Sequence, residues 1–151
     1  MSPENPVSPA AFDAERAMRL AFETFDIEAR ALLGLKARQG ESFVQAIRCM
    51  LESRGRVVVM GMGKSGHVGR KIAATLASTG TPAMFVHPAE ASHGDLGMVT
   101  AGDTVLAISN SGESDELSAI VPAIKRLGHT LVAMTGHADS TLARHADIVM
   151  S

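Results

Sequence analysis

The sequence predicts an α/β fold in which a five-stranded parallel sheet is flanked by helices and preceded by two N-terminal helices. Apolar runs of strand length alternate with segments of helical periodicity after residue 55, an order typical of βαβ units. The composition fits a buried sheet. Hydrophobic residues make up 46% of the 151-residue chain and aromatic residues only 3%, so aliphatic side chains must form the core.

The two N-terminal helices are predicted at Ala10–Leu33 and Glu41–Ser53. In the first, apolar residues recur in steps of three and four from Ala11 to Leu32, and Gly34 is a natural helix stop. One small sheet domain can cover only part of a stripe of this length. We therefore expect this helix to pack against another subunit.

Five strands and three further helices alternate along the rest of the chain. The strands are predicted at Arg56–Met60, Pro82–His87, Thr104–Ser109, Thr130–Met134 and Asp147–Met150. The helices are predicted at Ser65–Thr79, Ser114–Leu127 and Ser140–His145. Because ligands of parallel sheets bind at the carboxyl ends of the strands, the polar residues that follow each strand are the candidates for a site.

Length and composition exclude several classes of protein. The chain suits one domain, predicted at residues 10–151 behind a disordered, proline-rich arm at residues 1–9. The net charge of −2, without a long basic block, does not indicate nucleic-acid binding. No signal peptide or membrane span is evident, and the single Cys49 is typical of a reducing compartment. We expect a cytoplasmic protein.

The most informative stretch is DTVLAISNSGESDE, in which an apolar strand leads directly into a polar loop and then a helix. The loop supplies Ser109, Asn110, Ser111 and Ser114, where a helix cap alone needs only one such residue. Hydroxyls and free N–H groups at a helix N-terminus attract anions, so the pattern favours phosphate binding over capping alone. The acids Glu113, Asp115 and Glu116 would oppose a phosphate unless their side chains point away.

The loop after the first strand fits two nucleotide-binding motifs only in part. Gly63-Lys64-Ser65 matches the end of a P-loop, but the glycine required earlier is replaced by Val58. Gly61, Gly63 and Gly66 fit the dinucleotide fingerprint, yet the acid expected at the end of the second strand is absent. Lys64 stands at the strand edge, where it can meet a phosphate or an enediolate.

Three segments together resemble the sugar isomerase (SIS) domain of D-arabinose 5-phosphate isomerases: GMGKSGHVGRK, ASTGTPAMFVHPAEASHGDLGMV and ISNSGESDEL. The resemblance runs from about Arg56 to Asp147. It implies a flavodoxin-like fold and the interconversion of D-ribulose 5-phosphate and D-arabinose 5-phosphate through an enediol. This step opens the route to Kdo, the eight-carbon acid of bacterial lipopolysaccharide. The resemblance also implies no nicotinamide, flavin or required metal, and a homotetramer with sites shared between chains.

The same resemblance implies roles for individual residues. Lys64, His93 and Glu116 match the family's catalytic residues. Ser65, Ser109, Asn110, Ser111 and Ser114 would surround the phosphate and the sugar hydroxyls. Gly80, Thr81 and His87 match positions that contact substrate, and His87 also matches a position of adventitious zinc binding. From the residues alone, Glu116 in the first turn of a helix and His93 in a long connection have equally good structural explanations.

The family chain continues beyond the point that matches Ser151, with a further Glu, a Ser/Thr-rich loop, a His near Pro-Gly-Gly and often a pair of CBS domains. We therefore expect a C-terminally truncated SIS domain that binds a pentose 5-phosphate and isomerises it poorly or not at all. Two alternatives stay open: a phosphosugar-binding module without turnover, and an isomerase of another sugar phosphate, such as a heptose or hexulose.

Overall fold

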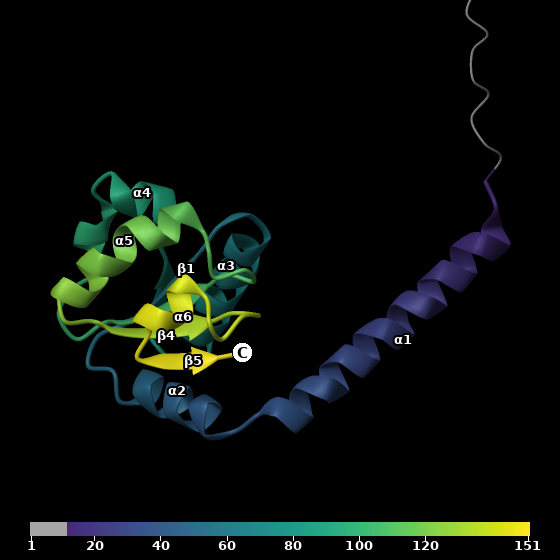
Figure 1. Ribbon diagram of the computed structural model, residues 1–151, viewed down its shortest axis with the longest axis horizontal. Helices are drawn as coiled ribbons and strands as arrows, with labels where there is room; N and C mark the ends of the chain where they lie inside the picture. Colours follow the sequence, from purple (N-terminus) through teal and green to yellow (C-terminus); the bar gives the residue numbers. More distant parts are fainter. Residues whose placement is uncertain (1–11) are drawn as a thin grey trace, which may run out of the picture. The chain divides into compact units, whose positions relative to one another are not determined.

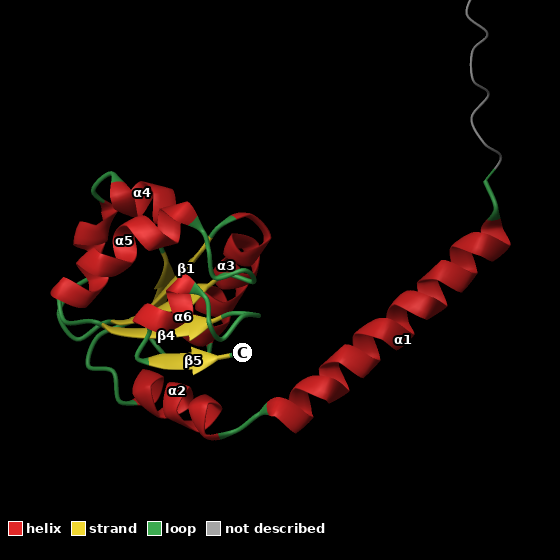
Figure 2. Ribbon diagram, in the orientation of Figure 1, coloured by secondary structure: helices red, strands yellow, loops and turns green. Residues whose placement is uncertain are grey.

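The structure, a computed structural model, describes residues 12–151 and divides the chain at Gln39. In the first unit the described structure is the helix α1 (Ala14–Arg38), and the second unit, from Gly40 to Ser151, is a layered α/β body (Figures 1 and 2). The predicted disordered arm at residues 1–9 lies outside the described residues. No helix within residues 12–151 combines the length and apolarity needed to cross a lipid bilayer.

All five predicted strands are present and form one parallel sheet. They are β1 (Val57–Gly61), β2 (Ala83–Phe85), β3 (Thr104–Ile108), β4 (Thr130–Met134) and β5 (Ile148–Met150). Their spatial order is β2-β1-β3-β4-β5, as in flavodoxin-like folds. Every residue of β1 and β3 is buried, because these central strands are covered on both faces.

Helices cover both faces of the sheet, which lies between them in Figure 2. On one face α2 (Glu41–Leu51) and α3 (Gly63–Ser78) pack against the side chains of Val57, Val59, Leu106 and Val132. On the other face α4 (Pro88–Ser92), α5 (Asp115–Arg126) and α6 (Thr141–His145) pack against Val58, Val105 and Leu131. Successive residues of one strand therefore enter two different cores, as the period of a strand dictates.

The ends of the elements differ from the predictions in ways that have physical causes. Helix α1 begins at Ala14, where the Asp13 carboxylate caps it by accepting a hydrogen bond from a backbone N–H of the first turn. The predicted stop at Gly34 is wrong, because α1 continues to Arg38. A single glycine costs a helix about 1 kcal/mol but leaves its backbone hydrogen bonds intact.

The segment between Pro88 and Asp103, predicted as a long connection, contains two short helices. These are α4, which has Pro88 at its first position, and a 3₁₀ turn at Asp95–Met98. Proline is well suited to the first helical turn, where its missing N–H would have no partner. Helix α4 packs on α5, so this connection covers the sheet rather than leaving it.

At the amino-terminal edge of the sheet, the buried carboxylate of Asp103 joins the starts of β1 and β3. It accepts hydrogen bonds from the backbone N–H groups of Arg56 (2.7 Å) and Thr100 (2.8 Å), and from the Arg56 guanidinium (3.0 Å). Burial alone would raise the pKa of Asp103, but the hydrogen bonds from Thr100 and Arg56 outweigh it and hold the pKa below its ordinary value.

Replacing Asp103 with Ala is expected to cost about 3 kcal/mol of unfolding free energy, because it leaves buried donors and the Arg56 charge without their partner. The pKa of Asp103 is lower in the folded state, so its contribution is complete above the ordinary carboxyl pKa and is lost as the pH falls through the folded-state pKa. Urea unfolding from pH 7 to pH 2 measures both effects. Exposed Asp139→Ala is the control, and an equal loss in both variants would contradict the argument.

Candidate functional site

The strand order places its topological switch point, where α/β sheets usually have a ligand crevice, between the carboxyl ends of β1 and β3. From β1 the chain crosses through α3 to β2, whereas from β3 it crosses through α5 to β4 on the opposite side. The two strands are paired to their ends, with Gly61 opposite Ile108. Ligands bind in α/β sheets where neighbouring connections diverge in this way. The prediction that the Gly61–His67 segment and the serine loop (Ser109–Ser114) share one edge is confirmed.

The serine loop is organised by its own hydroxyl groups. Each hydroxyl accepts a hydrogen bond from a following backbone N–H: Ser109 from Gly112 (3.1 Å), Ser111 from Glu113 (3.2 Å) and Ser114 from Leu117 (3.4 Å). Ser114 is the N-cap of α5. In the described part of the chain, the N–H groups of Asn110, Ser111 and Ser114 have no hydrogen-bond acceptor. One serine therefore caps the helix, and the rest of the loop keeps donors for an anion.

A second loop, Thr135–Thr141, packs against the serine loop and donates hydrogen bonds to it. Its backbone and the start of α6 donate three hydrogen bonds: from Gly136 to the Asn110 carbonyl (2.9 Å), from Leu142 to the Gly112 carbonyl (3.0 Å) and from Thr141 to the Glu113 carboxylate (2.7 Å). At Gly112, φ is +67° and an added Cβ would collide with the Ser140 hydroxyl, so only glycine fits. The sequence analysis assigned no role to this second loop.

Glu113 is turned away from the site. The carboxylate of this exposed residue lies at the N-terminus of α6, and hydrogen bonds from Thr141 hold its pKa below the ordinary value. A signal for this contact exists in the sequence, since Ser140-Thr141 begins a helix that a nearby acid can cap. Glu113 therefore points away from the serine loop, as an acidic residue beside a phosphate site must.

Lys64 and Ser65 lie in the first turn of α3, so the prediction that Lys64 stands on a loop is wrong. Helix α3 begins immediately after β1 because Gly66 lacks a side chain: a Cβ there would lie 2.6 Å from the Gly61 carbonyl oxygen. Lys64 is exposed and Ser65 half-buried at this edge. The helical position places Lys64 in the turn that follows the carboxyl end of β1.

The packing of α4 on α5 places His87 close enough for its charge to act on Glu116, whereas His93 lies at the other end of α4. His87 precedes α4 at the end of β2, and its ring stands edge-on to Phe85 (6.4 Å between centroids) with a buried Nδ1 that has no partner in the described residues. His93 is exposed at the other end of α4. Glu116 is half-buried in the first turn of α5.

The Glu116 carboxylate accepts a hydrogen bond from the Ser114 hydroxyl (2.8 Å). This bond, the residue's own backbone N–H and the charge of His87 hold the pKa of Glu116 below its ordinary value, against a smaller effect of burial. The carboxylate is therefore ionised at neutral pH and is available to accept a proton.

Gly80 and Thr81 are not part of this arrangement. They connect α3 to the start of β2, where the Pro82 carbonyl accepts a hydrogen bond from the backbone N–H of Val57 at the start of β1. The parallel sheet therefore places them at its amino-terminal edge, opposite the serine loop. Within one chain, the predicted substrate contact of these two residues is not supported.

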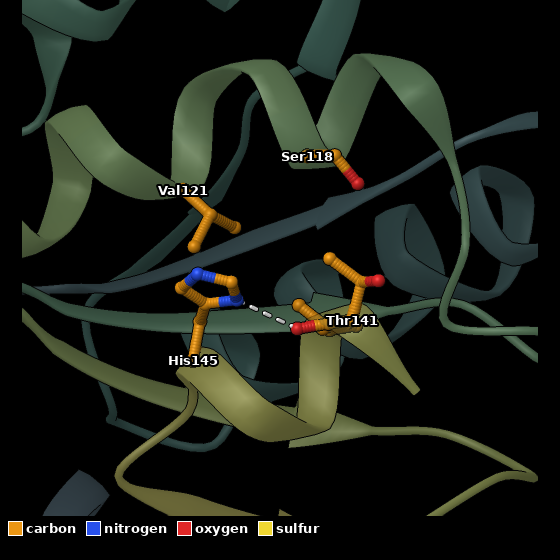
Figure 3. Close-up of a pocket in the computed structure, with 5 residues that line it drawn as sticks. Ser118, Val121, Thr141 and His145 are labelled. Atoms are coloured by element: carbon orange, nitrogen blue, oxygen red, sulfur yellow. Dashed lines mark hydrogen bonds between the residues drawn. The ribbon is translucent and has the colours of Figure 1, made fainter. Parts of the chain in front are cut away.

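The small cavity between α5 and α6 is not a substrate site. It is lined by Ser118, Val121, Thr141, Leu142 and His145, and Figure 3 shows the hydrogen bond that His145 Nδ1 donates to the Thr141 carbonyl (2.8 Å). Its volume of about 20 Å³ suits a single water molecule. Within residues 12–151 no three His, Cys, Asp or Glu side chains gather as a metal site.

Comparison with known proteins agrees with this geometry. The profile of the SIS domain family matches residues 50–151. Arabinose 5-phosphate isomerase KdsD from Pseudomonas aeruginosa PAO1 is 59% identical over 128 residues, which are 85% of this chain and 39% of that protein. The protein of the same name from Escherichia coli K12 is 53% identical over 137 residues, 91% of this chain and 41% of that protein.

A solved structure, that of E. coli CFT073 c3406 in complex with arabinose 5-phosphate, superposes with a TM-score of 0.87 at 40% sequence identity. The superposition covers 91% of this chain and 73% of the chain in that structure. By contrast, this chain spans about two fifths of the length of the curated relatives that it matches.

The contact between Glu113 and Thr141 can be tested by its effect on anion binding. Glu113→Ala removes one of the two hydrogen bonds that the start of α6 donates to the serine loop, and should weaken binding of inorganic phosphate by about three- to tenfold. Glu113→Gln keeps a carbonyl acceptor and should bind phosphate at least as well as the unaltered chain. Isothermal titration calorimetry measures both, with Asp115→Ala as the control for loss of negative charge alone. Equal weakening in the Ala and Gln variants would contradict the role given to this contact.

Proposed function

The chain belongs to the SIS domain family, and on that premise we propose that it is an aldose–ketose isomerase that interconverts D-ribulose 5-phosphate and D-arabinose 5-phosphate. The observation that carries the proposal is the crevice between β1 and β3, with the serine loop on one side and Lys64 on the other. The names of the relatives from P. aeruginosa and E. coli support the choice of substrate.

The proposed binding mode follows from the charge of the substrate. The phosphate accepts hydrogen bonds from the N–H groups of Asn110 and Ser111 and from the serine hydroxyls, with the dipole of α5 behind it. Ser65 and the Asn110 side chain face the sugar hydroxyls from the two sides of the crevice. Lys64 supplies the positive charge nearest to the carbonyl end of the sugar, and His87 closes the crevice at the end of β2.

The reaction needs a base, an acid and a group that stabilises an oxyanion. From the aldose, a base removes the C2 hydrogen as a proton while an acid protonates O1, which gives the enediol. Return of a proton to C1 with loss of the O2 proton then gives the ketose. We propose that Glu116 transfers the proton between C2 and C1, and that His93 transfers the proton between the oxygens O1 and O2. Lys64 stabilises the developing enediolate.

The role of Glu116 is supported by its ionised, half-buried carboxylate at the N-terminal end of α5. Transfer of the oxygen protons is assigned to His93, because an imidazole has one ring nitrogen that donates a proton and one that accepts. Neither step calls on a redox cofactor, since the isomerisation moves a proton within one molecule. The proposed setting is the cytoplasm and the supply of D-arabinose 5-phosphate for Kdo.

We also propose that the protein is a homo-oligomer, and favour a tetramer. No described residue of α1 is buried, although this helix carries Met18, Phe22, Phe25 and Leu32. An apolar stripe of this size is a typical subunit contact. A neighbouring copy is also the means by which Gly80 and Thr81 would reach a substrate that they do not approach within one chain.

The isomerase proposal predicts exchange of the substrate's C2 hydrogen with solvent. Incubated in D₂O with D-arabinose 5-phosphate, the chain should incorporate deuterium, as followed by proton NMR. Lys64→Met should slow this exchange by about 10² or more while phosphate still binds. Ser111→Ala should instead weaken substrate binding by about 1–3 kcal/mol.

Two results would count against the proposal in different ways. Binding of the pentose phosphate without any exchange would favour a phosphosugar-binding module. Equal affinity for D-arabinose and D-arabinose 5-phosphate would contradict the phosphate site itself. Parallel assays with heptose and hexulose phosphates test the choice of sugar.

The oligomer is tested by light scattering after size exclusion at micromolar concentration. We expect a mass of two to four chains, and Phe22→Glu together with Phe25→Glu should reduce it, because a charge in an apolar contact is costly. Glu28→Gln, on the same helix, is the control. A 15.8 kDa monomer for the unaltered chain would rule the assembly out.

A further inference from the structure

The Ser114 hydroxyl takes part in two hydrogen bonds at once. Its oxygen accepts from the Leu117 backbone N–H (3.4 Å), which caps α5, and its single proton is donated to Glu116 Oε2 (2.8 Å). The second bond is the shorter and is charge-assisted, because its acceptor is ionised. Ser114 therefore links the loop proposed to bind phosphate to the carboxylate proposed to move a proton.

The proton of Ser114 cannot serve two anions. A phosphate dianion only accepts hydrogen bonds, so a serine that binds it must donate. Within the described residues, the Ser109 and Ser111 hydroxyls accept from backbone N–H groups and donate to no protein atom, so their protons are available. The proton of Ser114 is already given to Glu116, and a phosphate oxygen at this position has to take it from the carboxylate.

We propose that Ser114 is a positioning residue that transfers its hydrogen bond from Glu116 to the substrate phosphate, so that capture of the phosphate frees Glu116 to act as the base. This inference rests on the proposed function. On this proposal the phosphate influences the basicity of Glu116, although it lies at the far end of the sugar from the reacting carbons. An unphosphorylated pentose would leave Glu116 held by Ser114 and less basic.

The direction of the effect follows from the groups around Glu116. The hydrogen bond from Ser114 is the largest cause of its lowered pKa, and the charge of His87 also lowers it. Among the elements packed on α5, α4 carries Glu90 and is followed by His93, α6 carries Arg144 and His145, and β4 has no titratable side chain; Asp115 is the neighbouring acid on α5 itself. Losing a donor to the charged form raises a carboxylate's pKa, which makes it a stronger base.

The experiment measures the pKa of Glu116 by NMR in the full chain, with ¹³C-labelled glutamate and the resonance assigned from Glu116→Gln. The probe is inorganic phosphate. In the unaltered chain we expect the pKa of Glu116 to rise when phosphate saturates the site. In Ser114→Ala we expect the pKa to be raised already without phosphate, and to rise less when phosphate is added.

Ser111→Ala is the matched control, because it removes a loop hydroxyl that does not contact Glu116. In this variant the pKa of Glu116 should be low without phosphate, as in the unaltered chain. At saturating phosphate it should rise by the full amount, because the charge of the phosphate and the loss of the Ser114 hydrogen bond both raise it. Ser114→Thr should behave as the unaltered chain, since it keeps the hydroxyl. Ser114→Gly covers the chance that Ala destabilises α5, because glycine at an N-cap costs only a few tenths of a kcal/mol.

The outcomes separate this inference from the proposed function. The transfer of the hydrogen bond is overturned if Glu116 has the same pKa in the unaltered chain and in Ser114→Ala. It is also overturned if phosphate raises the Glu116 pKa equally in both. Either result leaves the phosphate site intact. Failure of inorganic phosphate and of pentose phosphate to bind overturns both. A larger rise in the unaltered chain than in Ser114→Ala, with Ser111→Ala behaving as the unaltered chain, supports the transfer.

Discussion

The pairing of β1 with β3 is the constraint on which the rest of this structure depends. Both strands are buried along their whole length, so helices must cover the sheet on two faces. Since the connections leave this pair in opposite directions, the segments that follow Gly61 and Ile108 diverge at the carboxyl edge, where α/β sheets bind their ligands. The burial that stabilises the sheet thus also leaves a crevice at its carboxyl edge, where α3 and α5 both begin.

The crevice is made rigid by contacts between loops rather than by the core. The serine loop carries few apolar atoms, and its shape comes from hydrogen bonds within the loop and from the Thr135–Thr141 loop. At the opposite edge, Asp103 does the same for the starts of β1 and β3. Each end of the central strand pair is therefore held by hydrogen bonds that depend on one or two particular side chains.

The acidic residues around the serine loop are compatible with an anion site because each has a separate position. Glu113 faces the N-terminus of α6, and Glu116 is held by Ser114 in the first turn of α5. The low pKa of both groups records hydrogen bonds that stabilise their charges in place. On the proposed binding mode, Ser114 is the residue at which a phosphate and the Glu116 carboxylate compete for one proton.

The sequence by itself determined the fold class, the five strands and the position of the Gly61–His67 segment and the serine loop at one edge of the sheet. Apolar periodicity is a local property of the chain, and the shared edge follows from the parallel topology. The sequence predicted Ser109, Asn110 and Ser111 at the crevice for the same reason. Only the tertiary structure decided that Gly80 and Thr81 lie at the opposite edge, that Lys64 is helical and that Glu113 turns to Thr141. A side chain's partner depends on which distant segments the packed helices bring together, and no periodicity in the chain records that.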